Sequence, residues 1–374
     1  MGTRLLGFIS IVQSIIFLGH LFLYVTLVSF FGPGIATPSL KMALAILSIS
    51  FVVASLRGWY AHDPLARAVY VVAAVWLGIS SYLLWASLLC WIVYGFSRLL
   101  HLGWAAHTIG TVMYGLALLV SLYGLINASW LRVVHVPVTL PNLPEQWRGR
   151  VAALVSDLHL GHVRNGRFIR RVTRKLRELQ PNMVLLAGDM YDGVAADFEK
   201  LAEPWAEFLD WARNGGSFEG VFYIQGNHEE FYSHAEYLPP IRRAGVRVLN
   251  NEMVDLKGLQ LAGVHYRDAV NPESFREILR GLRLDRERPS ILMLHAPVRL
   301  PISEEEGVSL QVSGHTHGGQ FFPYTWIAQK VWSKFIYGLQ QFGKLQVYTS
   351  YGAGTWGPPM RVGTRPEIVL INFV

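Results

Sequence analysis

Four long apolar stretches occupy the first third of the chain and restrict the folds that are open to it. They lie at about 5–31, 38–56, 68–97 and 108–131, and the third, "AVYVVAAVWLGISSYLLWASLLCWIVYGF", contains no charged residue. A helix needs about 20 consecutive apolar residues to cross a bilayer. One such stretch could be a buried core helix, but four in succession predict a transmembrane region.

Charge divides the chain into two parts. Although 52% of the 374 residues are hydrophobic, Asp63 is the only acidic residue before position 132, and the remainder resembles an ordinary globular sequence. We therefore predict a transmembrane region at 1–131, a linker at 132–149 and a globular domain at 150–374. The linker sequence, "RVVHVPVTLPNLPEQWRGR", contains three prolines and predicts an extended segment with one strand at 132–138.

The basic residues near the span ends predict the orientation in the membrane. Four spans leave both ends of the chain on one side, and this side carries more of these basic residues. Cytoplasmic loops are enriched in Lys and Arg, so we predict a multi-pass integral membrane protein with its C-terminal domain in the cytoplasm. The residues are Arg4, Arg57, Arg67 and Arg132 on that side, against Lys41 and Arg98 on the other.

Short apolar runs that end in polar residues predict buried strands in the globular part. These runs are "VAALVSD", "NMVLLAGD", "GVFYIQGN", "SILMLHA" and "VSLQVSGH". Helical patterns lie between some of them, at 165–179, 197–213 and 272–281, so we predict an α/β domain. Because strands that end at one edge of a sheet can place their last residues in one site, we expect the polar residues after these runs to converge.

Those polar residues have the chemistry of metal ligands. Two carboxylates, an amide oxygen and several imidazoles suit divalent metals such as manganese, iron and zinc. Seven ligands are too many for one tetrahedral site, and they suit two metals about 3.5–4 Å apart that lower the pKa of a shared water. The seven ligands are Asp157, His159, Asp189, Asn227, His295, His315 and His317, and His228 directly follows Asn227.

The same residues form five ordered blocks, D-x-H, G-D, G-N-H-E, H and G-H-x-H, and this order resembles the calcineurin-like metallophosphoesterase family. The resemblance implies a two-sheet β-sandwich flanked by helices. It also implies a metal-dependent hydrolase that breaks phosphoric ester or pyrophosphate bonds by attack of a metal-bridging hydroxide. We expect two divalent ions as cofactors, manganese before iron, zinc or magnesium.

The resemblance also implies a role for each residue. Asp189 would bridge the two metals. His228 would donate a proton to the leaving oxygen or hold the phosphate, and Glu229 would orient it. The remaining ligands divide into Asp157, His159 and His317 for the first metal, and Asn227, His295 and His315 for the second.

Two segments suggest a substrate at the membrane. "RNGRFIRRVTRKLREL" predicts a basic helix that would favour an anionic leaflet, although a solvated outer face of an α/β helix explains it as well. "FFPYTWIAQKVWSKFIYGLQQFGK" has eight aromatic residues beside the double histidine. This segment could line an acyl-chain pocket or enter the membrane interface, or it could be packed in the core.

The C-terminal sequence, with R-P-E-I before a final strand, resembles a membrane-anchored branch of the family. That branch includes bacterial phosphodiesterases and hydrolases of UDP-diacylglucosamine. We therefore expect a lipid-like phosphodiester or pyrophosphate as substrate, nucleotide-linked or glycerophospho in type, with membrane lipids as partners and a place in phospholipid metabolism. No nucleic-acid motif is present, so no nucleic-acid partner is expected.

Two alternatives stay open. The enzyme could act on soluble phosphoesters and use the membrane only as an anchor. The protein could also be a membrane receptor or scaffold whose metal site does not turn over.

Overall fold

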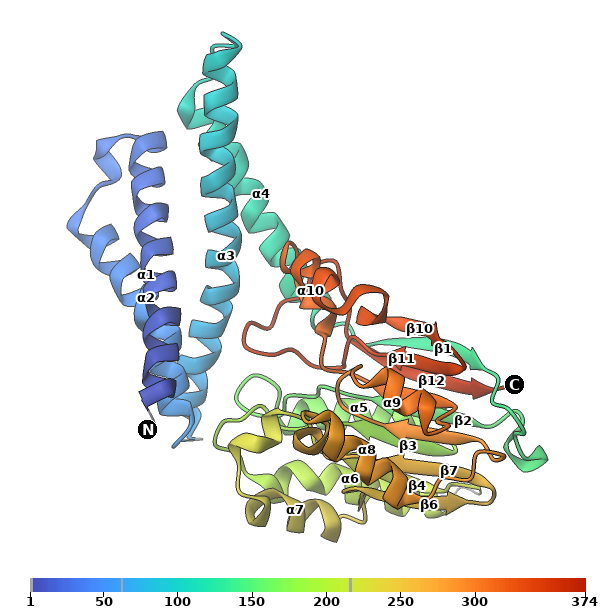
Figure 1. The fold of residues 1–374 in the computed structure, drawn as a ribbon. Helices are drawn as coiled ribbons and strands as arrows, with labels where there is room; N and C mark the ends of the chain where they lie inside the picture. Colours follow the sequence, from blue (N-terminus) through green and yellow to red (C-terminus); the bar gives the residue numbers. More distant parts are fainter. Residues whose placement is uncertain (1–2, 62, 215–216) are drawn as a thin grey trace. The chain divides into compact units, whose positions relative to one another are not determined.

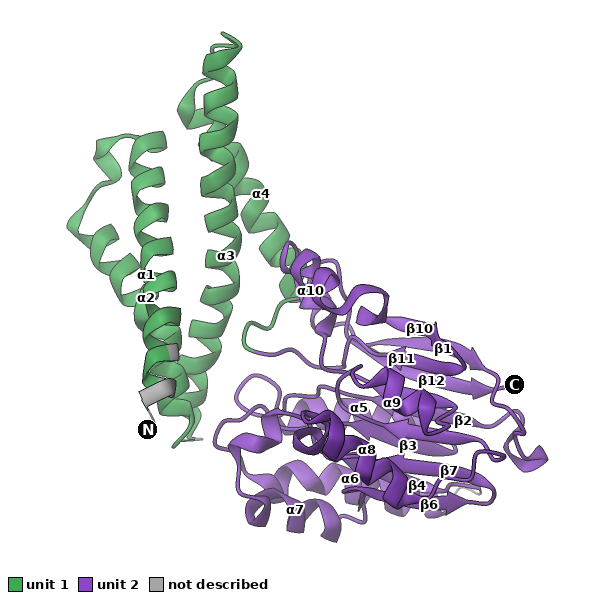
Figure 2. Cartoon of the chain, viewed as in Figure 1, with its two compact units in different colours: residues 1–126, 357–360 green, residues 127–356, 361–374 purple. Residues whose placement is uncertain are grey.

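The computed structural model describes residues 3–61, 63–214 and 217–374, and these form two compact units. Figure 2 shows them in green and purple. The helical unit comprises residues 1–126 and 357–360, and the α/β unit comprises residues 127–356 and 361–374. The chain therefore leaves the helical unit after residue 126 and returns to it for four residues near its C-terminal end.

The helical unit has a helix at each of the four predicted stretches. All four helices are long and apolar enough to cross a membrane. The fourth ends at Asn127, four residues before the end that we predicted. The helices are α1 (Thr3–Phe31), α2 (Pro38–Gly58), α3 (Pro64–Leu99) and α4 (Ala106–Asn127).

Polar side chains inside this unit pair with one another across helices. Trp76 Nε1 donates to His20 Nε2 at 2.9 Å, and Trp91 Nε1 donates to Thr26 Oγ1 at 2.9 Å. Such pairs join α3 to α1, as expected where water is not available to satisfy polar groups. The returning segment Gly357–Met360 packs on α3, where a Cβ atom at Gly78 would lie 3.1 Å from both Pro358 Cβ and Met360 Cε.

The α/β unit contains two six-stranded sheets (Figure 1). The first sheet has the order β1-β12-β2-β3-β4-β5 and the second has the order β10-β11-β9-β8-β7-β6. In the first sheet, β2, β3 and β4 are parallel neighbours, and β8 and β9 are parallel neighbours in the second. The strands of the first sheet are β1 (Arg132–Val138), β2 (Val151–Val155), β3 (Met183–Ala187), β4 (Gly220–Ile224), β5 (Arg247–Val248) and β12 (Glu367–Phe373). Those of the second are β6 (Glu252–Leu256), β7 (Leu259–Gly263), β8 (Ser290–Met293), β9 (Leu310–Ser313), β10 (Gly338–Phe342) and β11 (Leu345–Thr349).

Three apolar layers hold this unit together. Alternate residues of β3, such as Leu185 and Leu186, point to opposite faces of the first sheet and join different core clusters. One cluster lies between the two sheets. The other two lie beneath helices, with α5 (Gly166–Leu179), α6 (Phe198–Arg213) and α7 (His234–Arg243) on the first sheet, and α8 (Pro272–Leu282) and α9 (Leu300–Glu305) on the second. This arrangement confirms the predicted α/β fold, a two-sheet sandwich flanked by helices.

The segment that we expected to be a linker, 132–149, lies within the α/β unit. It contains the predicted strand as β1, which pairs in parallel with β12. Trp147 is fully buried and its Nε1 donates to the carbonyl of Leu256. The apolar side chains of this segment cover the sandwich core, so it is part of the sheet structure.

Candidate metal centre

The predicted ligands follow five parallel strands of the two sheets. Asp157 and His159 follow β2, Asp189 follows β3, and Asn227 follows β4. In the second sheet, one histidine follows β8 and two follow β9. The carboxyl-terminal ends of both sheets meet at one edge of the sandwich, which brings all seven residues together.

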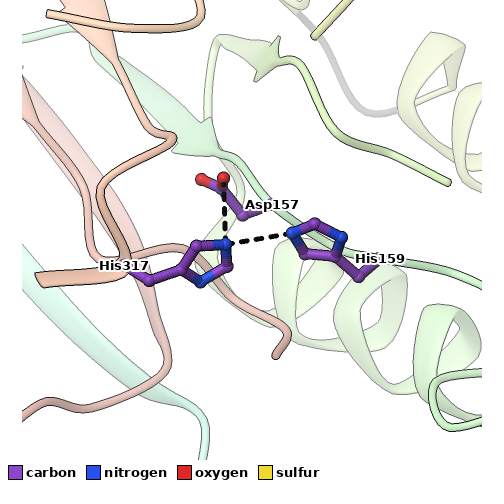
Figure 3. Close-up of side chains that lie close together, drawn as sticks. All are labelled: Asp157, His159 and His317. Atoms are coloured by element: carbon purple, nitrogen blue, oxygen red, sulfur yellow. Dashed lines mark hydrogen bonds and ion pairs between the residues drawn. The ribbon is translucent and has the colours of Figure 1, made fainter. Parts of the chain in front are cut away.

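The first cluster consists of Asp157, His159 and His317 (Figure 3). His159 Nε2 lies 3.0 Å from His317 Nε2, and His317 Nε2 lies 3.5 Å from Asp157 Oδ1. His159 and Asp157 are fully buried or nearly so. The three residues can therefore offer two nitrogens and one oxygen to a single ion.

The second cluster consists of Asn227, His295, His315 and Asp189. His315 Nδ1 lies 2.8 Å from Asn227 Oδ1 and 3.2 Å from His295 Nε2. His295 Nε2 in turn lies 3.2 Å from Asn227 Oδ1 and 3.2 Å from Asp189 Oδ2. These four atoms converge from both sheets.

Asp189 connects the two clusters. Its Oδ2 atom lies 3.2 Å from His295 Nε2 in the second cluster and 3.8 Å from His159 Nε2 in the first. One carboxylate is thus within reach of both positions. This is the placement that a bridging ligand requires.

The hydrogen bonds and charges of the site fit cations. His295 Nδ1 lies 2.8 Å from the carbonyl of Ala187, so this nitrogen carries the proton and Nε2 offers its lone pair. Burial lowers the pKa of His295, but the carboxylates of Asp189 and Asp157 outweigh it and raise the pKa to about 10. The surroundings of this nitrogen therefore favour a positive charge, and a divalent metal would supply one.

The backbone at the site is strained. Left-handed φ values cost an L-residue other than glycine about 1–2 kcal/mol each, and such strain is concentrated at functional sites. Gly226 also permits a close approach, because a Cβ atom there would lie 2.2 Å from Asp189 Oδ1. Five of the seven predicted ligands have positive φ: Asp157 (52°), His159 (47°), Asp189 (49°), His315 (71°) and His317 (47°).

His228 lies beside the first cluster. Its ring is 4.6 Å from the ring of His159, and its backbone N–H donates to Asp189 Oδ1 at 2.9 Å. The ring nitrogen Nδ1 lies 3.0 Å from the carbonyl of Asp192 and donates to it. Burial and the neighbouring His159 lower the pKa of His228.

The carboxylate of Glu229, which we expected to orient His228, binds backbone groups after β3 and β4. Its carboxylate is fully buried and accepts hydrogen bonds from the backbone N–H groups of Asp189, Tyr191 and Gly226. Burial and the charge of Asp189 raise the pKa of Glu229 to about 7. Glu229 therefore holds together the loops after β3 and β4 through these three backbone hydrogen bonds.

Three further residues support the histidines, and the sequence assigned no role at the site to two of them. Arg361 is fully buried, and its Nη2 lies 3.2 Å from His317 Nδ1 and donates to the carbonyl of Gly354. The ring of Tyr266 lies 5.9 Å from that of His315. Asp192 has Oδ1 3.2 Å from His159 Nδ1. Arg361 lies four residues before the R-P-E-I motif, and no local pattern reveals its contact with a histidine 44 positions away.

Glu230, His234 and His265 form another cluster that could hold a metal by distance alone. The backbone N–H of Arg267 donates to His265 Nδ1, so the proton of His265 is on Nε2. This nitrogen faces Glu230 Oε1 at 3.4 Å, and the Arg267 side chain also pairs with Glu230. A protonated nitrogen and an existing cation make this cluster a poor metal site.

Comparisons with known proteins agree with this geometry. The model of the calcineurin-like phosphoesterase family matches residues 151–319, the range that holds every predicted ligand. An uncharacterized metallophosphoesterase of Aquifex aeolicus is 30% identical over 264 residues, which are 69% of this chain and 97% of that protein. An uncharacterized metallophosphoesterase of Campylobacter jejuni is 31% identical over 64% of this chain. A transmembrane protein with a metallophosphoesterase domain from Danio rerio is 28% identical over 67% of this chain.

This chain spans 63% of the length of the Campylobacter jejuni relative and 59% of that of the Danio rerio relative. The match to the Aquifex aeolicus protein, by contrast, covers almost all of that relative. The strand-end ligands, the two-sheet sandwich and these matches lead to one conclusion. The chain belongs to the calcineurin-like phosphoesterase family of metal-dependent phosphoester hydrolases.

Proposed function

We propose that this protein is a membrane-anchored phosphoesterase with two divalent metals that hydrolyses a phosphodiester or pyrophosphate bond on a lipid-like substrate. The observation that carries the proposal is the convergence of two buried ligand clusters on the shared carboxylate of Asp189. Asp157, His159 and His317 would hold one metal, and Asn227, His295 and His315 would hold the other. We place manganese first among the candidate metals because the ligand set mixes imidazoles with carboxylate and amide oxygens.

The residues around the metals have distinct tasks in this proposal. Bound metals would supply an activated water and neutralise the charge of the phosphate. The carbonyl of Asp192 fixes the ring of His228 by accepting a hydrogen bond from Nδ1, and in the imidazolium form of His228 the second proton, on Nε2, would hold the phosphate or pass to the leaving oxygen. Glu229 holds the backbone that carries His228, and Arg361 holds the ring of His317.

Exposed apolar side chains on the segment after the double histidine support a lipid-like substrate. Helix α10 (Tyr324–Trp332) exposes Trp326, Ile327 and Val331 by 61–67% of their surface. Large apolar side chains that are exposed together on one short helix are typical of an interaction site, and we call these three residues the α10 patch. Because the same chain has four candidate membrane helices, we propose that this patch enters the lipid interface.

The basic helix α5 adds little to the membrane argument. Its apolar residues Ile169, Val172 and Leu176 are buried in the core beneath the first sheet. On its outer face, Arg170 pairs with Glu203 and Glu207 of α6. This is the structure of a solvated outer face of an α/β helix, the other explanation that the sequence allowed.

We also propose that the protein crosses the membrane four times with the α/β unit in the cytoplasm. The support is the number of candidate membrane helices and the excess of arginines on the side that holds both ends. This orientation would expose the metal centre to substrates made in the cytoplasmic leaflet.

The first experiment is hydrolysis by the purified full-length protein in detergent with added manganese. An aryl phosphodiester is compared with the matching monoester, and the His228→Ala variant serves as the control. Turnover of the diester that the variant lacks is the expected result. Absence of turnover of both esters, with two metals per chain verified, would contradict a general phosphoesterase and favour a scaffold whose metal site does not turn over.

A further inference from the structure

An apolar cavity of about 200 Å³ lies beside the second metal cluster. His315 forms part of its wall, so a group inside the cavity would be adjacent to an atom bound at the metals. Tyr266 and Trp332 flank this histidine, with ring centroids 5.9 and 5.5 Å from the ring of His315. The remaining lining residues are Ala269, Val270, Leu294, Ala296, Val298 and Arg299.

The lining of the cavity favours a hydrocarbon group over a polar one. It contains no carboxylate, and Arg299 is its only residue with a permanent charge. The guanidinium of Arg299 is already engaged, because Nε donates to the carbonyl of Ala269 at 2.8 Å and Nη2 donates to the carbonyl of Val270. Arg299 therefore acts as a fixed wall, and a polar occupant would find few partners in the cavity.

The size of the cavity limits its occupant further. A protein cavity of about 150 Å³ holds one benzene molecule. A pocket of about 200 Å³ thus holds one aromatic ring or about five carbons of a branched chain, and the remainder of a longer chain would lie outside it.

The position of the cavity indicates which part of a substrate it holds. His228 is absent from the lining and lies beside His159 of the first cluster, whereas the cavity borders His315 of the second. Because His228 is the proposed proton donor to the leaving oxygen, the leaving group lies on the side of His228. The cavity is then available to the ester group that stays on phosphorus.

We propose that this cavity is a specificity pocket for a compact branched or aromatic hydrocarbon group on the retained side of the phosphoester. This inference rests on the proposed phosphoesterase function and narrows its substrate class. It favours a lipid whose hydrocarbon begins next to the phosphate over one that places a polar glycerol there.

The test varies only the retained ester group. Methyl 4-nitrophenyl phosphate and phenyl 4-nitrophenyl phosphate share one leaving group, and kcat/KM is measured for both with the full-length, manganese-loaded protein. We expect the phenyl ester to be preferred by about 10-fold or more, since one small apolar group in a fitting pocket is worth at least about 10-fold. Equal kcat/KM values would overturn the pocket but leave the proposed function intact.

Substitutions at Val298 make the test specific to the cavity. Val298→Phe fills the space and should reduce the phenyl-to-methyl ratio to near one, whereas Val298→Ala enlarges it and should extend the preference to a naphthyl ester. General damage to the protein would not shift the size preference of the two Val298 variants in opposite directions. Val374→Phe, at an exposed position of the C-terminus, is the matched control and should keep the wild-type ratio.

A binding measurement covers the case in which neither ester is hydrolysed. Calorimetry with the metal-loaded protein compares phenylphosphonate with methylphosphonate. The pocket predicts a Kd for phenylphosphonate that is lower by about 10-fold, and Val298→Phe should remove the difference. Equal Kd values for phenylphosphonate and methylphosphonate in the wild type would refute the pocket, whether or not the protein hydrolyses the esters.

Discussion

The metal centre is made by residues that adopt unfavourable backbone conformations. Five predicted ligands have left-handed φ values. Glu229 accepts three hydrogen bonds from backbone groups in the loops after β3 and β4. Strain of this kind persists only where surrounding contacts determine the backbone. The surrounding contacts therefore hold the backbone of the ligands in place, and single substitutions should separate metal binding from proton transfer.

His228→Ala tests proton transfer. The variant should keep two metals per chain and lose turnover by about 10²–10⁴-fold, the usual contribution of a general acid. Metal content by mass spectrometry and kcat for an aryl phosphodiester are measured on the same preparation. A loss of metal that parallels the loss of turnover would place His228 among the ligands instead.

Asp189→Ala tests the bridge. The variant removes a carboxylate that reaches both clusters, so the metal content should fall from two to one or fewer per chain. Asp210→Ala, an exposed position on α6, should retain both metals. An unchanged metal count in Asp189→Ala would refute the proposed division of the ligands.

At the scale of elements, the sequence predicted those strands that are buried on both faces of a sheet. Strands β2, β3 and β4 are buried on both sides, so they appear as unbroken apolar runs that end where Asp157, Asp189 and Asn227 begin. The site was predictable for the same reason, because its residues follow these runs at once. Strand β12 pairs with β1 and β2, more than 200 positions away, and no local pattern encodes such a partner.

Local sequence patterns did not predict the half-exposed elements or the contacts that support the metal ligands. None of the five residues of strand β10 is fully buried, so the strand has no apolar run that marks it in the sequence. The roles of Glu229 and Arg361 depend on which backbone atoms come near them after folding. Sequence blocks identify the ligands well, but they do not identify the groups that hold those ligands in place.

Glu219 lies directly before β4, at the end of the strand opposite the metal centre. Substitution of Glu219 measures how much its ionic hydrogen bonds stabilise this end of the sheet. Burial raises its pKa, but hydrogen bonds from Lys257 and Arg150 outweigh this and hold the pKa of Glu219 below its usual value. A lowered pKa contributes stability above pH 4.5 that is lost as the pH falls through the folded-state pKa. Glu219→Gln should therefore lower stability by about 1–2 kcal/mol at pH 7.

Thermal unfolding of Glu219→Gln at pH 7 and pH 4 measures this effect. The difference in Tm from the wild type should shrink at the lower pH. Glu252→Gln, at an exposed position of β6, should change Tm little at either pH. A Tm difference for Glu219→Gln that is constant with pH would show that the loss is not electrostatic.

Substitutions on helix α10 test the proposed contact of this helix with the lipid interface. Ile327→Ser combined with Val331→Ser removes two exposed apolar side chains, and partial burial of each in lipid would be worth on the order of 1 kcal/mol. We expect hydrolysis of a substrate embedded in vesicles to fall by about 10-fold, with hydrolysis of a water-soluble aryl ester maintained. Val374→Ser should affect neither reaction, and a parallel loss of both in the α10 variant would contradict a role limited to the membrane.

At the scale of the whole molecule, the orientation of the chain can be tested with its single cysteine removed. In a Cys90→Ser background, Lys200→Cys on α6 and Leu102→Cys between α3 and α4 are each labelled with a membrane-impermeant maleimide in spheroplasts. The cytoplasmic orientation predicts labelling of residue 102 in intact spheroplasts and of residue 200 only after lysis. The reverse pattern would place the metal centre outside the cytoplasm.

The return of residues Gly357–Met360 to the helical unit has a consequence for how such a protein could arise and be exchanged. A tethered domain needs one junction with its tether, whereas this chain passes between its units after residues 126, 356 and 360. Trp356 and Arg361, on either side of the returning segment, contact His228 and His317. A single cut in the gene after α4 would therefore separate Gly357–Met360 from α3, on which this segment packs. A hybrid with a different membrane anchor would keep the segment but lack its packing partner.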